Sequence, residues 1–307
     1  MRIGFSVPVS GSWATPENMK RIARRADELG YHGVWAFQRL LYPVGNPMGP
    51  VYRSVHDPVV ALAYVAAVTE RVRLGVAVLN LPFVSPVLMA KQLASLQEVS
   101  GGRLDVGLGL GWLPEEFAAS GVPMERRGRR AEEYVGLLRR LWTEDVVEHK
   151  GEFYEVPPSH QAPRPATPPS VMLGGTARVA LERAGRIADG WISSSRADLG
   201  TIDQQIAIVK EAARQAGRDP DALRFVVRGV TRVRARDEGP LTGSYDKIRR
   251  DVEDLAAKGV TEVFHDLNFD PEIGNPEADP RDSMRRAEEA LEALGPVSKS
   301  AAAVPPL

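Results

Sequence analysis

Short apolar runs alternate with helical patterns along almost the whole chain, and this alternation constrains the fold most. Runs typical of buried strands lie at residues 2–9, 33–37, 72–79, 103–111, 170–174, 189–192, 223–233 and 260–267. A helical pattern follows each run, which is typical of a parallel sheet covered by helices. Eight such pairs predict an α/β fold of the TIM (β/α)8 barrel type, with an open doubly wound sheet as the alternative.

Capping residues followed by proline mark three of the expected helix starts. Thr15-Pro16, Asp57-Pro58 and Ser85-Pro86 each combine a side-chain acceptor with a proline at the first helical position. An acceptor can satisfy the free N–H groups of a first turn, and proline has no N–H to leave unsatisfied there. These pairs therefore fix where three of the helices begin.

The pattern predicts one barrel domain over residues 1–295, with two insertions and a flexible tail at 296–307. Residues 40–55 are rich in proline and glycine and are long enough for a lid or a site wall. Residues 143–170 contain EVPP and PRPATPP, and these prolines predict irregular chain draped over the barrel. We expect the two insertions to select a small-molecule substrate, because such loops carry specificity.

Composition excludes several classes of site. The chain has no cysteine, so disulfides, thiolate metal sites and cysteine nucleophiles are excluded. Its five histidines are scattered without metal-ligand spacing, and its net charge is −1. We therefore expect no metal site, no nucleic-acid partner and no membrane association, and a soluble, cytoplasmic protein.

The stretch VGLGLGWLPEEF at 106–117 places glycine at positions 107, 109 and 111. It is not a dinucleotide-binding fingerprint, which needs G-x-G-x-x-G after a first strand. Glycines that alternate in a strand all face the same side, so this row predicts free space beside the sheet. Either neighbouring side chains fill the space, or a flat ligand lies there, at the strand end where TIM barrels place their active sites.

Three stretches resemble the luciferase-like monooxygenase superfamily, a group of flavin- and deazaflavin-dependent TIM barrels. They are SLQEVSGGRLDVGLGLGWLPEEFAASGVPMERRGRRAEEYVGLLRRLW at 95–142, LGVAVLNLPFVSPVLMAKQLASL at 74–96 and VMLGGTARVALERAGRIADGW at 171–191. The form LGLGWLPEEF most resembles the actinobacterial branch that uses the deazaflavin F420. The resemblance implies a cofactor of this kind, F420 or alternatively FMN.

The resemblance places the cofactor on defined residues. The third strand of F420-using relatives ends in a bulge with a non-prolyl cis peptide against the deazaflavin ring. That position falls on Ala77-Val78, with Asn80 just beyond; the alternative is an ordinary trans strand with Ala77 in the core. Further cofactor contacts are expected from Ser6, Gly109 and Gly111. The turn Gly174-Gly175-Thr176 would hold the phosphate, with Thr176 as helix cap, since helix N-termini bind anions.

The sequence departs from the family at its acid–base positions. Relatives of the F420 dehydrogenase type often carry Asp-His after the second-strand tryptophan, where this chain has Gln38 and Arg39. Arginine stays protonated and cannot shuttle a proton as histidine does. Arg39 could hold an anionic substrate, polarise a carbonyl or conjugated system, or form a salt bridge on the rim. Some relatives have a catalytic glutamate where Trp112 stands, and tryptophan can only pack or donate one hydrogen bond.

Three functions follow from these observations. The leading hypothesis is an F420-dependent oxidoreductase that transfers a hydride, as a reductase of a small organic substrate, with Gln38, Arg39 and Trp112 at the reacting centre. An FMN-dependent monooxygenase is the alternative, and a catalytically inactive cofactor-binding barrel is the third.

The family commonly pairs barrels, so the resemblance implies a homodimer. We expect it to form through two apolar helices, ALAYVAAV at 61–68 and MAKQLASLQ at 89–97. Packing of these helices on the barrel explains their apolar character equally well.

Overall fold

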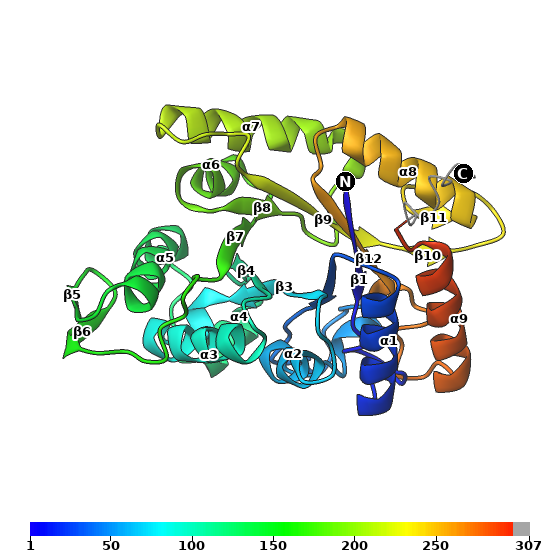
Figure 1. Ribbon diagram of the computed structural model, residues 1–307, viewed down its shortest axis with the longest axis horizontal. Helices are drawn as coiled ribbons and strands as arrows, with labels where there is room; N and C mark the ends of the chain where they lie inside the picture. The colour runs from blue at the N-terminus through cyan, green and yellow to red at the C-terminus, as the bar shows by residue number, and fades with distance from the viewer. Residues whose placement is uncertain (297–307) are drawn as a thin grey trace, which may run out of the picture.

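A closed barrel of parallel strands forms the centre of the computed structural model, which describes residues 1–296 (Figure 1). Around the barrel the strands run in the order β1, β12, β9, β8, β7, β4, β3, β2. Their bounds are β1 (Arg2–Ser6), β2 (Gly33–Ala36), β3 (Arg73–Asn80), β4 (Leu104–Gly109), β7 (Ser170–Gly174), β8 (Gly190–Ile192), β9 (Arg224–Val230) and β12 (Glu262–Asp266). The predicted TIM barrel is confirmed, and the open sheet is excluded.

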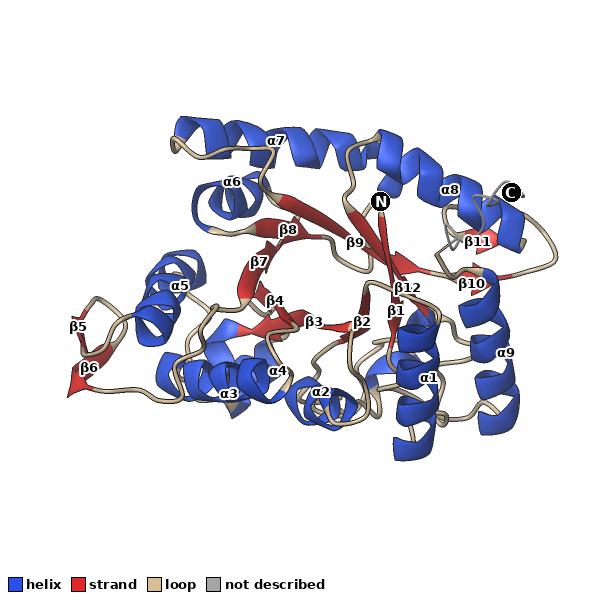
Figure 2. Cartoon of the chain, viewed as in Figure 1, coloured by secondary structure: helices blue, strands red, loops and turns tan. Residues whose placement is uncertain are grey.

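Helices surround the barrel, as the colouring by secondary structure shows (Figure 2). They are α1 (Pro16–Glu28), α2 (Pro58–Ala66), α3 (Pro86–Val99), α4 (Pro114–Ala119), α5 (Arg127–Thr143), α6 (Arg178–Ile187), α7 (Ile202–Gln215), α8 (Tyr245–Ala257) and α9 (Pro280–Ala293). The predicted caps are confirmed: Thr15, Asp57 and Ser85 each accept a hydrogen bond from a first-turn N–H.

Residues 143–170 differ from the prediction. Part of this segment pairs as an antiparallel hairpin of β5 (Val147–Lys150) and β6 (Glu155–Ser159), which projects from the barrel beside α5 (Figure 1). The carboxylate of Glu133 on α5 anchors it, accepting N–H groups from the 152–154 turn and contacting His149 at 2.9 Å. Glu133 therefore holds the turn of the hairpin against α5, while residues 160–169, which contain PRPATPP, form no helix or strand, as predicted. The expected tail lies outside the described residues, apart from residue 296.

The largest differences in strand bounds are at carboxyl ends. The first strand ends at Ser6 rather than residue 9, the fourth at Gly109 rather than residue 111, and the seventh at Val230 rather than residue 233. The remaining short strands, β10 (Arg232–Val233) and β11 (Thr242–Gly243), pair with each other outside the barrel.

A small apolar layer fills the middle of the barrel. Trp35 and Phe264 stack at 4.9 Å between ring centroids, together with Met172, Ile192 and Val226. A Cβ on Gly75 would lie 2.3 Å from the Trp35 ring, so glycine is required there for the indole to fit. This layer separates the two ends of the barrel, which have different polar side chains.

Candidate active site

One cavity of about 830 Å³ lies at the carboxyl ends of the barrel strands. Residues from β3, β4, β7, β8 and β9 line it together with the loops that follow β2, β4 and β8. TIM barrels place their active sites at this end. The volume is in the range of small-molecule and cofactor sites.

The end of β3 forms the floor of this cavity. The Ala77–Val78 peptide bond is cis, as the resemblance implied, and the pairing of β3 with β4 shifts register between Val76 and Leu79. Ala77 and Val78 both line the cavity. The alternative of an ordinary trans strand is therefore wrong.

The glycines of β4 make room for this bulge. A Cβ on Gly109 would lie 2.5 Å from Cγ2 of Val78, and one on Gly107 would lie 2.5 Å from the carbonyl oxygen of Val76 and 3.3 Å from Cγ1 of Val78. A neighbouring strand therefore occupies much of the space beside the glycine row. Val78, resting over these glycines, becomes part of the cavity wall.

Gly111 does not belong to the row. It lies beyond the end of β4 with a φ of +72°, and a Cβ there would lie 2.9 Å from ring carbons of Phe83 and Phe117. The expectation that all three glycines face one side of a strand is wrong at this position, because left-handed backbone ends the extended conformation. Gly111 still lines the cavity.

Gln38 and Asn80 connect the ends of three strands. Oε1 of Gln38 accepts the backbone N–H of Asn80 at 2.9 Å, and Oδ1 of Asn80 accepts the N–H of Gly111 at 3.1 Å. Both side chains are buried and line the cavity. These bonds hold the segments after β2, β3 and β4 in a fixed relation.

Arg39 forms a salt bridge, as one of its interpretations predicted, but the pair is buried. Its Nη1 lies 2.9 Å from Oε2 of Glu116, with side chains 5% and 1% exposed. The other oxygen of Glu116 accepts the N–H groups of Leu40 and Leu41 at 2.8 and 3.2 Å. Glu116 therefore fixes both Arg39 and the start of the 40–55 segment.

Two aromatic rings pack against the same guanidinium. The Cζ of Arg39 lies 4.8 Å from the ring centroids of both Tyr52 and Trp112. Such cation–π contacts are worth about 0.5–2 kcal/mol each. Trp112 is half exposed and stands at the cavity wall, as expected.

Arg228 lines the cavity and was missed by the sequence analysis. From β9 its Nε donates to Asp266 at 2.6 Å, and its Nη1 donates to the carbonyl of Ala77 at 3.0 Å. The guanidinium packs on Phe37 and Phe269, with Cζ 4.6 and 4.2 Å from the ring centroids. The signal was present as a charged residue inside the apolar run RFVVRGV, since buried charges are paired.

The glycine turn after β7 leads into α6. Gly174, Gly175 and Thr176 line the cavity, and Gly175 has a φ of +136°. Thr176 does not cap the helix: the cap position is Ala177, which offers no side-chain acceptor. No side chain caps the first turn of α6. The N–H of Ala180 already donates to the carbonyl of Ala177, and the earlier N–H groups of the turn have the position in which helix N-termini bind anions.

Four arginines lie at this end of the cavity and were not predicted: Arg126, Arg127, Arg183 and Arg196. Arg126 and Arg183 are ion-paired with Glu152 at 2.6 Å and Glu132 at 3.2 Å. Within residues 1–296, neither Arg127 nor Arg196 forms an ion pair. Glu125 also lines the cavity and forms no ion pair within these residues, so four arginines and one carboxylate line this end of the cavity.

Ser6 is the predicted site residue that does not line the cavity. It is buried at the end of β1, where its hydroxyl accepts the N–H of Leu267 at 3.1 Å. Its hydroxyl thus connects β1 to the segment after β12.

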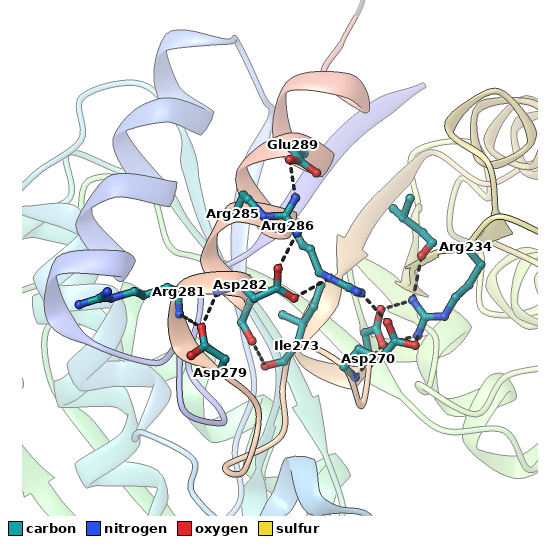
Figure 3. A network of polar contacts seen from close by, with 12 residues as sticks. Arg234, Asp270, Ile273, Asp279, Arg281, Asp282, Arg285, Arg286 and Glu289 are labelled. Atoms are coloured by element: carbon teal, nitrogen blue, oxygen red, sulfur yellow. Dashed lines mark hydrogen bonds and ion pairs between the residues drawn. The ribbon is translucent and has the colours of Figure 1, made fainter.

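A second cavity of about 550 Å³ lies between β10 and α9. Its arginines are paired with carboxylates: Arg234 with Asp270 at 2.6 Å and Arg286 with Asp282 at 3.0 Å (Figure 3). Arg285 likewise pairs with Glu289 at 2.7 Å. Arg286 also pairs with Glu272, which binds α9 to the segment after β12, and none of the three arginines is left without a carboxylate.

The described part of the chain contains no group of three or more His, Cys, Asp or Glu side chains placed to hold a metal ion. Among residues 1–296 there is also no helix with the length and apolarity needed to cross a membrane.

A family model described as luciferase-like monooxygenase matches residues 1–295. An uncharacterized protein of Mycobacterium tuberculosis (strain ATCC 25618 / H37Rv) is 36% identical over 215 residues, 69% of this chain and 70% of the relative. An F420-dependent glucose-6-phosphate dehydrogenase of Amycolatopsis mediterranei is 32% identical over 224 residues, 70% of this chain and 64% of that protein. An FMNH2-dependent dimethylsulfone monooxygenase of Pseudomonas putida is 30% identical over 207 residues, 66% and 55% of the two chains.

Solved structures agree in fold. The monooxygenase RslO1 of Streptomyces bottropensis superposes with a TM-score of 0.79 at 24% identity, covering 96% of this chain and 98% of the other. An F420-dependent secondary alcohol dehydrogenase, solved with an F420–acetone adduct, has a TM-score of 0.77 at 16% identity, covering 95% and 98%.

Proposed function

The chain belongs to the luciferase-like monooxygenase family, and from this premise we propose that it is an F420-dependent oxidoreductase. In this proposal it reduces a small organic substrate by hydride transfer. Relatives in the family use either F420 or FMN, so the choice between the two must come from the cavity itself.

The observation that carries the proposal is the joining of separate segments in one cavity. The bulge at Ala77–Val78 and the turn at Gly174–Gly175 lie apart in the sequence, yet both line the same 830 Å³ space. An apolar floor suits a flat ring system, and the first turn of α6 suits a phosphate. The residues present therefore fit a cofactor with both parts.

The arginines favour F420 over FMN. F420 extends beyond its phosphate into a chain of glutamates, whereas FMN ends at its phosphate. Arg127 and Arg196 form no ion pair among the described residues, and the four arginines at the phosphate end of the cavity outnumber the one carboxylate of its lining, Glu125. Guanidinium groups bind carboxylates and phosphates through charge-assisted hydrogen bonds, so a longer anionic tail gains more contacts here.

When bound, reduced F420 supplies a hydride, while the protein orients the reactants and excludes water. We assign the orienting role to Gln38 and Asn80, whose hydrogen bonds fix the strand ends around the floor. Arg39 is assigned a hydrogen-bonding role toward the substrate, and Trp112 forms the outer wall. The cavity lining contains no histidine, so we assign the proton to water.

Binding tests this proposal. Purified protein is titrated with F420 and with FMN, following quenching of each cofactor's fluorescence. We expect F420 to bind at least about tenfold more tightly, a difference of ~1.4 kcal/mol. Tight binding of FMN with no binding of F420 would replace the proposal by the second candidate, an FMN-dependent monooxygenase like the Pseudomonas putida relative.

Turnover distinguishes the proposed oxidoreductase from the third hypothesis, a catalytically inactive cofactor-binding barrel. Protein loaded with reduced F420 is assayed against enones and imines by the recovery of oxidised-cofactor absorbance, and protein loaded with oxidised F420 is assayed against alcohols by the loss of that absorbance. The proposal predicts turnover of at least one class. Cofactor binding with no turnover across the panel would instead indicate a barrel that has lost its chemistry.

A further inference from the structure

Two buried arginines line the inner part of the cavity, and each is already compensated by a carboxylate. Arg39 pairs with Glu116 at 2.9 Å, and Arg228 pairs with Asp266 at 2.6 Å. The arginine side chains are 5% and 9% exposed, and the carboxylates 1% and 2%. Each pair sums to zero charge. The inner part of the cavity is thus neutral, unlike the phosphate end.

The zero net charge of these two ion pairs determines which ligands can bind beside them. A bound carboxylate would add a negative charge beside two buried carboxylates with no cation left to neutralise it, and burying an unpaired charge is costly. An uncharged oxygen acceptor needs only hydrogen-bond donors. The balance therefore favours a neutral acceptor over an anion at this end.

Hydrogen-bond donors remain unused. A guanidinium offers five N–H groups, yet Nε and Nη1 of Arg39 are buried and make no hydrogen bond to a described residue. Nη1 lies close to Glu116, but without the angle of a hydrogen bond. An unsatisfied buried donor costs about 1–3 kcal/mol, so a ligand oxygen that accepted from Arg39 would gain stabilisation.

Arg228 also has one buried donor without a partner, its Nη2, but it has a different position. Its Nε and Nη1 are hydrogen-bonded to Asp266 and to the Ala77 carbonyl, which ties the guanidinium to the floor of the cavity. Arg39 instead follows β2 and packs on Tyr52 and Trp112, in the segments that surround the strand ends. Arg39 is therefore the donor placed for the substrate, and the rings around it provide flat apolar surface.

We propose that the substrate is an uncharged, flat, conjugated carbonyl compound whose oxygen accepts a hydrogen bond from Arg39. The inference rests on the proposed function and names its substrate class. It also decides between the two ligand roles that the sequence left open for Arg39, in favour of the carbonyl.

Reduction of such a compound balances with reduced deazaflavin as the reductant. A hydride adds to the carbon β to the carbonyl, the C=C π bond breaks, and the electron pair moves to the carbonyl oxygen as an enolate. The N–H groups of Arg39 stabilise this developing charge. A proton from water then reaches the α-carbon, and the hydroxide that remains takes the N–H proton released when the cofactor is oxidised, so the products are the saturated carbonyl compound, oxidised cofactor and water.

The test compares two ligands that differ in one group. 4-Phenylbut-3-en-2-one carries a methyl ketone at the position where trans-cinnamate carries a carboxylate. Binding is measured by titration calorimetry, with and without oxidised F420. We expect the ketone to bind about tenfold more tightly than the carboxylate. Equal or tighter binding of cinnamate would overturn the inference in favour of an anion site.

A charge-matched double variant tests Arg39 itself. R39M/E116Q removes both charges, so neither buried partner is left uncompensated. We expect ketone binding to weaken about tenfold, and the ¹³C shift of the labelled ketone carbonyl to move toward its value in an aprotic solvent. An unchanged affinity and carbonyl shift would overturn the assignment of Arg39.

Failure of this inference can be distinguished from failure of the proposed function. F420 fluorescence is recorded in the same samples. Quenching by the wild-type protein with no preference for the ketone overturns only the substrate class. No quenching overturns the proposed function, and with it the substrate inference that rests on it.

Discussion

Strands β9 and β12 place an arginine–carboxylate pair at each end of the barrel. At the amino ends Arg224 donates to Glu262 at 2.8 Å, and at the carboxyl ends Arg228 donates to Asp266 at 2.6 Å. The positions are four residues apart in both strands, so both pairs face inward. The same local chemistry thus occurs above and below the apolar layer.

The surroundings of the two pairs differ. Asp105 accepts from Arg224 at 2.6 and 3.1 Å and from Arg73 at 2.8 Å, while the indole of Trp35 donates to Glu262 at 3.1 Å. Protein groups thus bind most polar atoms at the amino end. Among the described residues of this cluster, Nε of Arg224 and Nε2 of His32 are the buried atoms without a hydrogen-bond partner.

Arg224 also lines a cavity, of about 570 Å³, together with residues that precede β1, β9 and β12. The Arg228 pair borders the 830 Å³ cavity, which the cis peptide bond of β3 and the glycine turn after β7 also line. Neither a buried ion pair nor adjoining space alone therefore indicates function; the groups gathered around the space do.

The largest effect is expected from breaking the amino-end network. Burial raises the pKa of Asp105, but hydrogen bonds from Arg73 and Arg224 outweigh this and hold it below its usual value. Asp105→Asn leaves these arginines without their shared anion and should lower the free energy of unfolding by about 3–5 kcal/mol. Urea denaturation measures it. A loss below ~1 kcal/mol would mean that the network contributes little stability.

The second-largest effect is expected from acid, which should lower the free energy of unfolding through His32 at the amino end of the barrel. Burial lowers the pKa of His32 to about 4, so the folded state disfavours the protonated ring. This contribution is complete above the unfolded value near 6.5 and is lost as pH falls toward 4, by about 1–3 kcal/mol. His32→Gln should flatten that part of the pH–stability curve. His160→Gln, at a 72% exposed position, is the control; equal slopes in all three proteins would contradict the prediction.

A smaller effect is expected from the phosphate end. Arg127→Gln should weaken F420 binding about three- to tenfold by removing a charge-assisted contact, while changing unfolding by less than ~0.5 kcal/mol. Arg281→Gln, on α9 away from the cavity, serves as the matched control. Fluorescence titration at two salt concentrations provides the measurement. Equal affinity of both variants would remove Arg127 from the site.

The smallest effect on folding is expected on the outer surface. The apolar residues of the expected 89–97 dimer segment are buried, including Met89 and Leu93, whereas Val60 and Tyr64 on α2 are 70% and 38% exposed. If α2 contributes to a homodimer, Val60→Asp should shift sedimentation toward the monomer, with unfolding of the monomer changed by less than ~0.5 kcal/mol. A monomeric wild-type protein would contradict the homodimer.

The fold was predictable because its signals are local. Strand runs and the caps at Thr15, Asp57 and Ser85 depend on residues close together in the chain, and the structure confirms them. The end of β4 was not predictable in the same way. It depends on Asn80, which accepts the N–H of Gly111 from 31 residues away.

The site was predictable where the resemblance supplied it and not elsewhere. Ala77–Val78, Gly109 and the turn at Gly174 were expected, and the structure brings them into one cavity. Arg228 was missed because its partners lie 38 and 151 residues away, at Asp266 and Ala77. The position of Val78 beside the β4 glycines could not be predicted either, because Val78 lies on the adjacent strand β3.

The central claim is that the cavity at the carboxyl ends of the strands holds a deazaflavin over Val78 and the β4 glycines. Its most direct test is F420 fluorescence quenching by the wild type, Gly109→Val and Gly136→Ala, the last at a helix position where a Cβ meets no atom within 4 Å. We predict similar binding by wild type and Gly136→Ala, and a loss of at least about tenfold for a still-folded Gly109→Val, because the added side chain displaces Val78. Full F420 affinity in Gly109→Val would contradict the claim.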